Sequence, residues 1–259
     1  MEPMAKRTSG WLISQHGAYA MLAVPFIAGL RYTLQPGWWL TAVAAGWVCA
    51  YMAFNAITLS LKAPKKRKAS FRPPLITYSV LAAVFGVVSI LFGGLGLLGW
   101  VGLLLFPGTI ALWCAATGQE RSVLSGMMTT LVASAIGLVV AYPSLTSWLH
   151  FGSARLDAIL TICFGYFFGT VLHVKALVRE HGKSGARFRN LCWHVLVLGF
   201  AITSAFGTLN WWWAVLALGW LVRSCVMSWF DSRGRISVST VGLVEVAFSL
   251  LLLLAVIFA

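Results

Sequence analysis

The chain has 259 residues, of which 60% are hydrophobic and only 10% are charged, and its mean hydropathy is +0.88. This composition excludes an ordinary water-soluble domain and is typical of a polytopic helical membrane protein. Nineteen Lys and Arg residues against six Asp and Glu residues give a net charge of +13. The basic residues recur in every second gap between apolar runs, so the charge indicates membrane topology and no nucleic-acid partner is expected.

The apolar runs predict the membrane spans directly. A spanning helix needs about 20 mostly apolar residues, because the hydrocarbon core is about 30 Å thick. In chain order the predicted spans are Trp11–Leu30, Trp38–Leu61, Leu75–Phe92, Leu95–Ala116, Val123–Ala141, Leu156–Val178, Leu191–Leu209, Trp211–Phe230 and Val238–Phe258. Only the glycine-rich segment Gly93–Gly96 separates the third span from the fourth, so counts of eight or ten also fit. The predicted fold class is all-α: a single transmembrane helical domain over residues 1–259 with about nine spans.

Nine spans sort the connecting segments by side of the membrane. All of the nineteen basic residues except Arg31 and Arg155 then fall toward one side. Lys and Arg are enriched in cytoplasmic loops. The distribution therefore predicts an inside N-terminus, an outside C-terminus and surface contact with anionic membrane lipids.

Polar and ionisable side chains in or beside the spans are the candidates for function, because such groups are costly in a bilayer. Most of them are expected near the cytoplasmic level. The candidate ligand-binding residues are Gln15, His16, Asn55, Lys62, Glu120, Arg121, His173, Lys175, Arg179, Arg223 and Glu245.

Two groups of these residues are expected to share a helix face. Asn55, Thr58 and Lys62 are spaced i, i+3 and i+7 in the second span. Lys175 and Arg179 are four residues apart at the end of the sixth span. The alternative for the two basic residues of the sixth span is ordinary positive-inside charge.

Arg223 and Glu245 lie deeper, each about seven or eight residues or roughly 10–12 Å from the inner end of its span. We expect an ion pair between them, because each charge would otherwise be desolvated alone. A structural staple and a role in a ligand cavity are equally good interpretations. His16, His173 and His194 are expected at one depth, where His16 and His173 are candidate proton carriers or else hydrogen-bonded packing residues.

Several short motifs resemble those of the YwiC-like family of bacterial membrane proteins. They are the segment Gln15–Leu22 followed by Pro25, the pair Glu120-Arg121, the segment His173–Glu180 and the segment Gly242–Glu245. The resemblance covers most of the chain. It implies a multi-pass protein of the bacterial inner membrane and specifies no activity.

The arrangement of spans more distantly resembles the UbiA superfamily of intramembrane prenyltransferases. That resemblance implies two Asp-rich motifs, after the second span and near the sixth, which hold magnesium against an isoprenyl diphosphate. If Asn55 is aligned with the first motif, Ala56, Leu59 and Ala63 occupy its aspartate positions; Lys175 and Arg179 occupy those of the second motif. We therefore expect no metal site and no cofactor.

Basic residues in place of acidic ones suggest direct binding of an anion. Lys62, Lys175 and Arg179 are predicted to contact the phosphate or carboxylate of a long-chain lipid, of the isoprenoid or phospholipid kind, in a cavity open to the cytoplasmic side. These residues do not distinguish a binding protein from a transferase. The alternatives are a small secondary transporter or permease, with Arg223, Glu245 and the histidines along its path, and a membrane assembly factor without catalysis.

Overall fold

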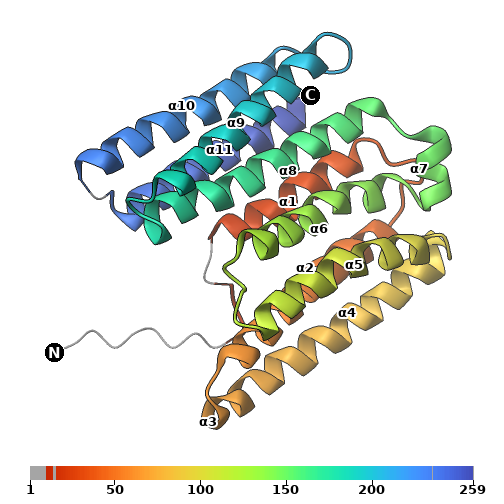
Figure 1. Ribbon diagram of the computed structural model, residues 1–259. Coiled ribbons are helices and arrows are strands. Elements are labelled where there is room, and N and C mark those ends of the chain that lie inside the picture. The colour runs from red at the N-terminus through yellow and green to blue at the C-terminus, as the bar shows by residue number, and fades with distance from the viewer. Residues whose placement is uncertain (1–9, 14–15, 235, 259) are drawn as a thin grey trace.

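The computed structural model describes residues 10–13, 16–234 and 236–258, and these residues fold into helices joined by short turns (Figure 1). The elements in order are α1 (His16–Leu30), α2 (Trp39–Lys62), α3 (Lys65–Lys68), η1 (Ala69–Phe71), α4 (Arg72–Gly93), α5 (Leu97–Ala116), α6 (Val123–Ala141), α7 (Leu145–Phe151), α8 (Ala154–Val174), η2 (Lys175–Arg179), α9 (Ser184–Ala205), α10 (Trp212–Arg233) and α11 (Val238–Phe258).

The long helices are arranged in three groups (Figure 1). Helices α2, α4 and α5 form one side of the bundle, and α9, α10 and α11 form the other. Between them lie α1, α6 and α8, which contact one another and join the two sides. Leu156, Ile162 and Trp220 are almost completely buried and belong to a core that includes this middle group and the neighbouring α10.

Within the described residues, eight helices are long and apolar enough to cross a membrane, as expected of a polytopic helical bundle. Helix α1 is shorter than the span predicted there, because it begins at His16 and not at Trp11. The Tyr78 hydroxyl donates a hydrogen bond to the Trp11 carbonyl (2.8 Å) and so holds the preceding residues outside the helix. The segment Gly93–Gly96 is a tight turn, in which Gly94 adopts a φ of +101°.

Two other predicted boundaries differ from the structure. The sixth predicted span ends as the α-helix α8 at Val174 and continues to Arg179 as the π-helix η2. The seventh begins seven residues earlier than predicted, at Ser184, because this polar first section is helical and buries Ala186 and Asn190 against its neighbours.

Ion pairs and hydrogen bonds between residues near the helix ends show which of these ends lie together. The Lys62–Glu120 ion pair joins the end of α2 to the α5–α6 turn, and the Arg187–Asp231 pair joins the start of α9 to the end of α10. We call this the basic end. At the opposite end, Arg31 donates hydrogen bonds to the carbonyls of Val256 and Ile257 in the last turn of α11. A guanidinium is well suited to these free carbonyls, which accounts for Arg31, one of the two basic residues predicted on this side.

Backbone packing between α1 and α6 holds the middle group together. Gly29 and Gly137 meet there, and a Cβ atom on Gly137 would lie 2.7 Å from the Pro25 carbonyl oxygen. Close helix packing through small residues is a main source of helix association in membranes. Gly165 and Gly169 in α8 likewise accommodate Val197 and His194 of α9, so this pair of small residues packs within the chain.

The close crossing of α1 and α6 at Gly29 and Gly137 can be tested by measuring protein stability. We expect Gly137→Ala to lower the free energy of unfolding by about 1–3 kcal/mol, the usual cost of overpacking. The matched control is Gly102→Ala in α5, where an added Cβ has no neighbour within 4 Å. Thermal unfolding in mild detergent measures both; equal melting temperatures for the two variants would contradict the proposed importance of the crossing.

Candidate functional site

A polar pocket of about 170 Å³ lies at the basic end, where α2, α5 and α6 meet. Its lining residues are Ile13, Tyr51, Phe54, Asn55, Thr58, Lys62, Ala111, Ala115, Glu120, Ser125 and Thr129. We call it the basic-end pocket. The three residues predicted to share a face of the second span, Asn55, Thr58 and Lys62, all line it.

The charged rim of this pocket contains more cations than anions. Lys62 Nζ lies 3.0 Å from Glu120 Oε1, and Arg121 Nε lies 3.5 Å from the same oxygen. Arg179 lies close enough for the charges of Arg121 and Glu120 to act on its guanidinium. Among the described residues Arg179 makes no ion pair, so the carboxylate of Glu120 is paired with two cations, Lys62 and Arg121.

The Asn55 side chain provides an unused hydrogen-bond donor. Its amide nitrogen is buried and has no hydrogen-bond partner among the described residues. The Thr58 hydroxyl is already used, because it donates to the Asn55 backbone carbonyl (2.8 Å). A buried donor without a partner costs about 1–3 kcal/mol. The pocket can therefore recover free energy by binding a ligand that carries hydrogen-bond acceptors.

The surrounding charges also affect the titration of Glu120. Partial burial acts to raise the pKa of its carboxyl, but the hydrogen bond from Lys62, a backbone hydrogen bond and the charges of Lys62 and Arg121 outweigh burial. The pKa is consequently lower than its ordinary value of 4.5. Glu120 is thus held ionised and positions Lys62 at the pocket.

Lys175 and Arg179 do not act as one group. The π-helix η2 contains both, and Lys175 Nζ lies 3.5 Å from Glu180 Oε1 while Arg189 binds the other oxygen of Glu180 at 2.7 Å. Lys175 is not among the residues that line the basic-end pocket. Arg179 is not among those lining residues either, so of the three basic residues predicted to meet at one cavity mouth only Lys62 lines this pocket. Gln15 and the side chain of His16 lie outside the described residues.

A second polar region lies inside the bundle, between α8, α9, α10 and α11. Arg223 Nη1 donates to Glu245 Oε2 at 2.7 Å, as predicted, and both side chains are buried. The Thr170 hydroxyl donates to the same oxygen at 2.8 Å. Tyr166 donates to the Glu245 backbone carbonyl (3.0 Å) and lies 2.9 Å from the Ser249 hydroxyl.

Histidines and Asn190 continue this network toward the basic end. His194 Nδ1 donates to the Asn190 backbone carbonyl (2.8 Å), and its Nε2 accepts from Arg223 Nη2 (3.3 Å). The Asn190 side-chain nitrogen lies 2.6 Å from Ser224 Oγ and 3.2 Å from His173 Nδ1. We call these connected side chains the α8–α11 network; the candidate proton carrier His173 belongs to it and does not line the basic-end pocket.

Sequence reasoning named four members of this network, His173, His194, Arg223 and Glu245, and missed Tyr166, Thr170, Asn190, Ser224 and Ser249. Helical spacing is the signal that could have found three of them. Thr170 is three residues before His173, Asn190 is four residues before His194 and Ser249 is four residues after Glu245, so each lies one turn from a predicted residue. Uncharged polar residues are common in membrane helices, however, and only the helix contacts show which of them face the ion pair.

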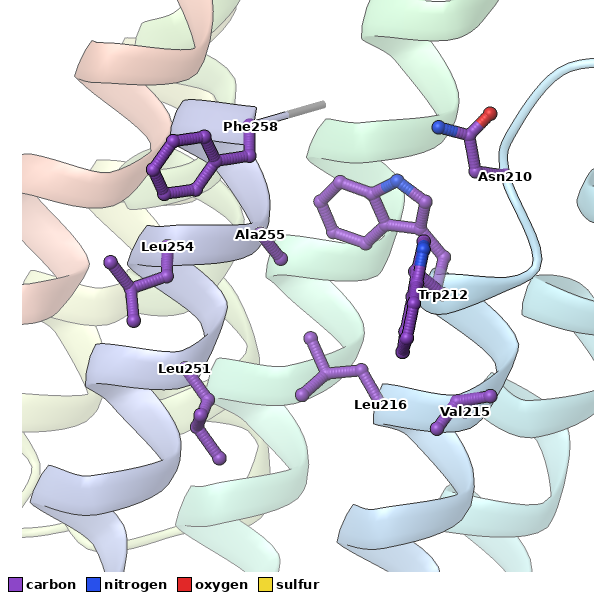
Figure 2. Close-up of a pocket in the computed structure, with 9 residues that line it drawn as sticks. Asn210, Trp212, Val215, Leu216, Leu251, Leu254, Ala255 and Phe258 are labelled. Carbon is purple, nitrogen blue, oxygen red and sulfur yellow. The ribbon is translucent and has the colours of Figure 1, made fainter.

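An apolar groove of about 450 Å³ lies at the opposite end, between α10 and α11 (Figure 2). Trp212 and Leu216 come from α10, Leu251 and Leu254 from α11, and Asn210 from the preceding turn. Tryptophans near the ends of spanning helices, such as Trp212, are typical of the membrane interface. None of the residues predicted to bind a ligand lines this groove.

These observations define a multi-pass helical membrane protein with a donor-rich polar pocket at its basic end and a buried ionic network. Among the described residues, no group of three His, Cys, Asp or Glu side chains could hold a metal ion. The chain belongs to the YwiC-like protein family, whose pattern matches residues 12–142, just over half of its length.

Two bacterial relatives align along nearly the whole chain. The Bacillus subtilis (strain 168) protein described as uncharacterized protein YwiC is 29% identical over 237 residues, which cover 90% of each chain. A Haemophilus influenzae protein described only as uncharacterized is 24% identical over 251 residues, covering 93% of this chain and 97% of its own. No solved structure matches the chain, so the distant resemblance to the UbiA superfamily stays a prediction.

The Glu120 environment predicts a pH-dependent stability. A carboxyl whose pKa is lowered by folding stabilises the protein above its unfolded pKa and loses that contribution as the pH falls through the folded value. We expect Glu120→Gln to unfold at a lower temperature than the wild type near neutral pH. This difference should shrink as the pH falls below the ordinary pKa of 4.5 and disappear once the pH is below the lowered pKa of the folded protein. A difference independent of pH would contradict the electrostatic explanation.

The buried ion pair predicts strong coupling between its two members. Arg223→Met or Glu245→Gln alone should reduce stability by about 3–5 kcal/mol, because each leaves a buried charge without its partner. The double replacement Arg223→Met with Glu245→Gln should cost clearly less than the sum of the single changes. Unfolding in detergent over the full double-mutant cycle measures the coupling, and additive effects would show that the two charges do not interact.

Proposed function

We propose that this protein binds an anionic long-chain lipid of the isoprenoid or phospholipid kind, with its head group in the basic-end pocket. The observation that carries the proposal is the buried Asn55 amide nitrogen, a donor without a partner among the described residues. At the rim, Lys62 and Arg121 pair with the carboxylate of Glu120, and the guanidinium of Arg179 lies within range of these charges. A phosphate or carboxylate supplies the oxygens that these donors lack.

The position of the pocket favours a lipid over a soluble anion. It lies at the end of spanning helices, at the level where lipid head groups meet the hydrocarbon. Its apolar lining comes from Tyr51 and Phe54, which lie deeper along α2 than Lys62, and from Ala111 and Ala115 of α5. A volume of about 170 Å³ fits a head group and its first carbons. The rest of the lipid tail would extend along the helices into the membrane.

Each polar residue has a defined role in this proposal. Asn55 donates to an oxygen of the head group from the floor of the pocket. Lys62 contributes a positive charge and is held in place by Glu120, whereas the guanidinium groups of Arg121 and Arg179 bind at the mouth in a fork. The basic end would face the cytoplasm of a bacterial inner membrane, where anionic lipids attract Lys and Arg.

Mass spectrometry of lipids that co-purify with the protein in mild detergent tests the proposal. We expect Asn55→Leu, and the double variant Arg121→Gln with Arg179→Gln, to lose an anionic lipid that the wild type retains. A charge-assisted hydrogen bond is worth about 1.5–3 kcal/mol, so retention should fall roughly ten- to hundred-fold.

The matched control removes two positive charges from the same end of the bundle but outside the pocket. Lys66 and Arg67 in α3 are exposed, and the variant Lys66→Gln with Arg67→Gln should keep the lipid. Equal anionic-lipid content in the wild type and the pocket variants would overturn the proposal. Loss from the control and pocket variants alike would show attraction to the basic surface in place of a specific site.

A further inference from the structure

Buried polar residues of α10 lie at successive depths between the basic end and the α8–α11 network. At the rim, the buried Asp231 carboxylate lies 2.9 Å from His181 Nδ1 and 3.1 Å from Arg187 Nη2. Along the same side of α10 follow the buried polar residues Ser228, Ser224 and Arg223. Asp231 and Arg223 are eight residues apart, which corresponds to about 12 Å of helix. A polar stripe thus leads from the rim to the ion pair.

Beyond the ion pair the described interior is mostly apolar, apart from the buried indole nitrogen of Trp220. Tyr166 and Ser249 form the last polar level, and Trp220, Trp213, Leu252 and Val256 are buried on the side toward the opposite end. The polar stripe therefore opens toward one end only. This one-sided arrangement differs from a continuous path through the membrane.

The hydrogen bonds determine the protonation of His194. A backbone carbonyl can only accept, so Nδ1 of His194 must carry the proton that it donates to Asn190. Arg223 can only donate, so Nε2 of His194 must be the acceptor. His194 is neutral in this arrangement, and a second proton on it would face the Arg223 guanidinium.

Buried atoms without partners surround the ion pair. They are Glu245 Oε1, Arg223 Nε and the Asn190 side-chain oxygen. A network that serves only to join helices is expected to satisfy its buried polar atoms, because each unsatisfied one is costly in a low-dielectric interior. Glu245 Oε1 is an open position at which the carboxylate can accept a proton.

We infer that the α8–α11 network is a proton-exchange site, in which Glu245 takes up a proton delivered from the basic end. The carboxylate becomes a neutral carboxylic acid, and its ion pair with Arg223 is lost while the guanidinium keeps its charge. Arg223 retains the contact with His194 and lies over the rings of Tyr166 (5.8 Å) and Phe248 (5.2 Å). These aromatic faces stabilise a cation that has lost its carboxylate.

Few titratable groups among the described side chains lie against Glu245. From α10 it meets Arg223, from α8 Thr170 and Tyr166, and from α9 His194 acts through Arg223. Helix α1 also packs against α11; its titratable residues are His16 and Tyr19, and the Tyr19 hydroxyl is directed to the Ile13 carbonyl. Among the described side chains, Arg223 is thus the charged group in contact with Glu245.

Infrared difference spectroscopy of the protein in lipid bilayers tests this site. Between about pH 9 and about pH 4, a range that includes ordinary and buried carboxyls, we expect a protonated-carboxyl band that Glu245→Gln abolishes. Asp157→Asn is the matched control, because Asp157 accepts from Trp148 near the start of α8, at the opposite end, and its replacement should leave that band intact. Absence of a Glu245-dependent band would overturn the inference.

The direction of entry requires a second measurement. In oriented proteoliposomes, a pH jump on the side of the basic end should produce the Glu245 band faster than a jump on the other side, and Asp231→Asn should slow it. Equal rates from both sides would contradict one-sided access. Should Glu245→Gln fail to fold, ¹³C labelling of glutamate carboxyls in the wild type reports the same titration, since the chain has only six acidic residues. Lipid retention by the basic-end pocket is independent of either result.

Discussion

Polar groups within a hydrocarbon layer need partners, and this requirement shapes the interior of the bundle. Arg223 and Glu245 would each be costly alone, yet at 2.7 Å they neutralise one another. Their remaining hydrogen-bonding capacity brings in Thr170 of α8 and His194 of α9, so four helices are joined around one ion pair. Elsewhere close contact is achieved through small residues such as Gly29 and Gly137, because apolar side chains alone gain little by leaving lipid.

The two polar regions of the protein differ in how completely they are closed. The basic-end pocket lies among α2, α5 and α6, has a surplus of cations at its rim and contains the free donor of Asn55. The α8–α11 network has balanced charges at the Arg223–Glu245 pair and is enclosed by buried apolar residues on the side away from the basic end. The basic-end pocket suits a ligand with its own negative charge, and the α8–α11 network suits the exchange of a single proton.

The middle helices connect these two regions. Helix α6 lines the basic-end pocket through Ser125 and Thr129 and also packs closely against α1 through Gly137. Helix α1 in turn contacts α11, which carries Glu245. A short chain of packed helices therefore links the pocket to the buried ion pair without any direct contact between their charged groups.

The sequence by itself determined the features that depend on distance along a helix. The limits of α6 and α11 follow to the residue from the lengths of their apolar runs, and the Arg223–Glu245 pair follows from equal depths on successive spans. Only the tertiary structure decided which faces meet: the π-helix η2 brings Lys175 to Glu180, and α9 brings Asn190 to His173. Hydropathy records depth in the membrane, whereas the rotation of each helix about its axis depends on side-chain packing against helices distant in the sequence.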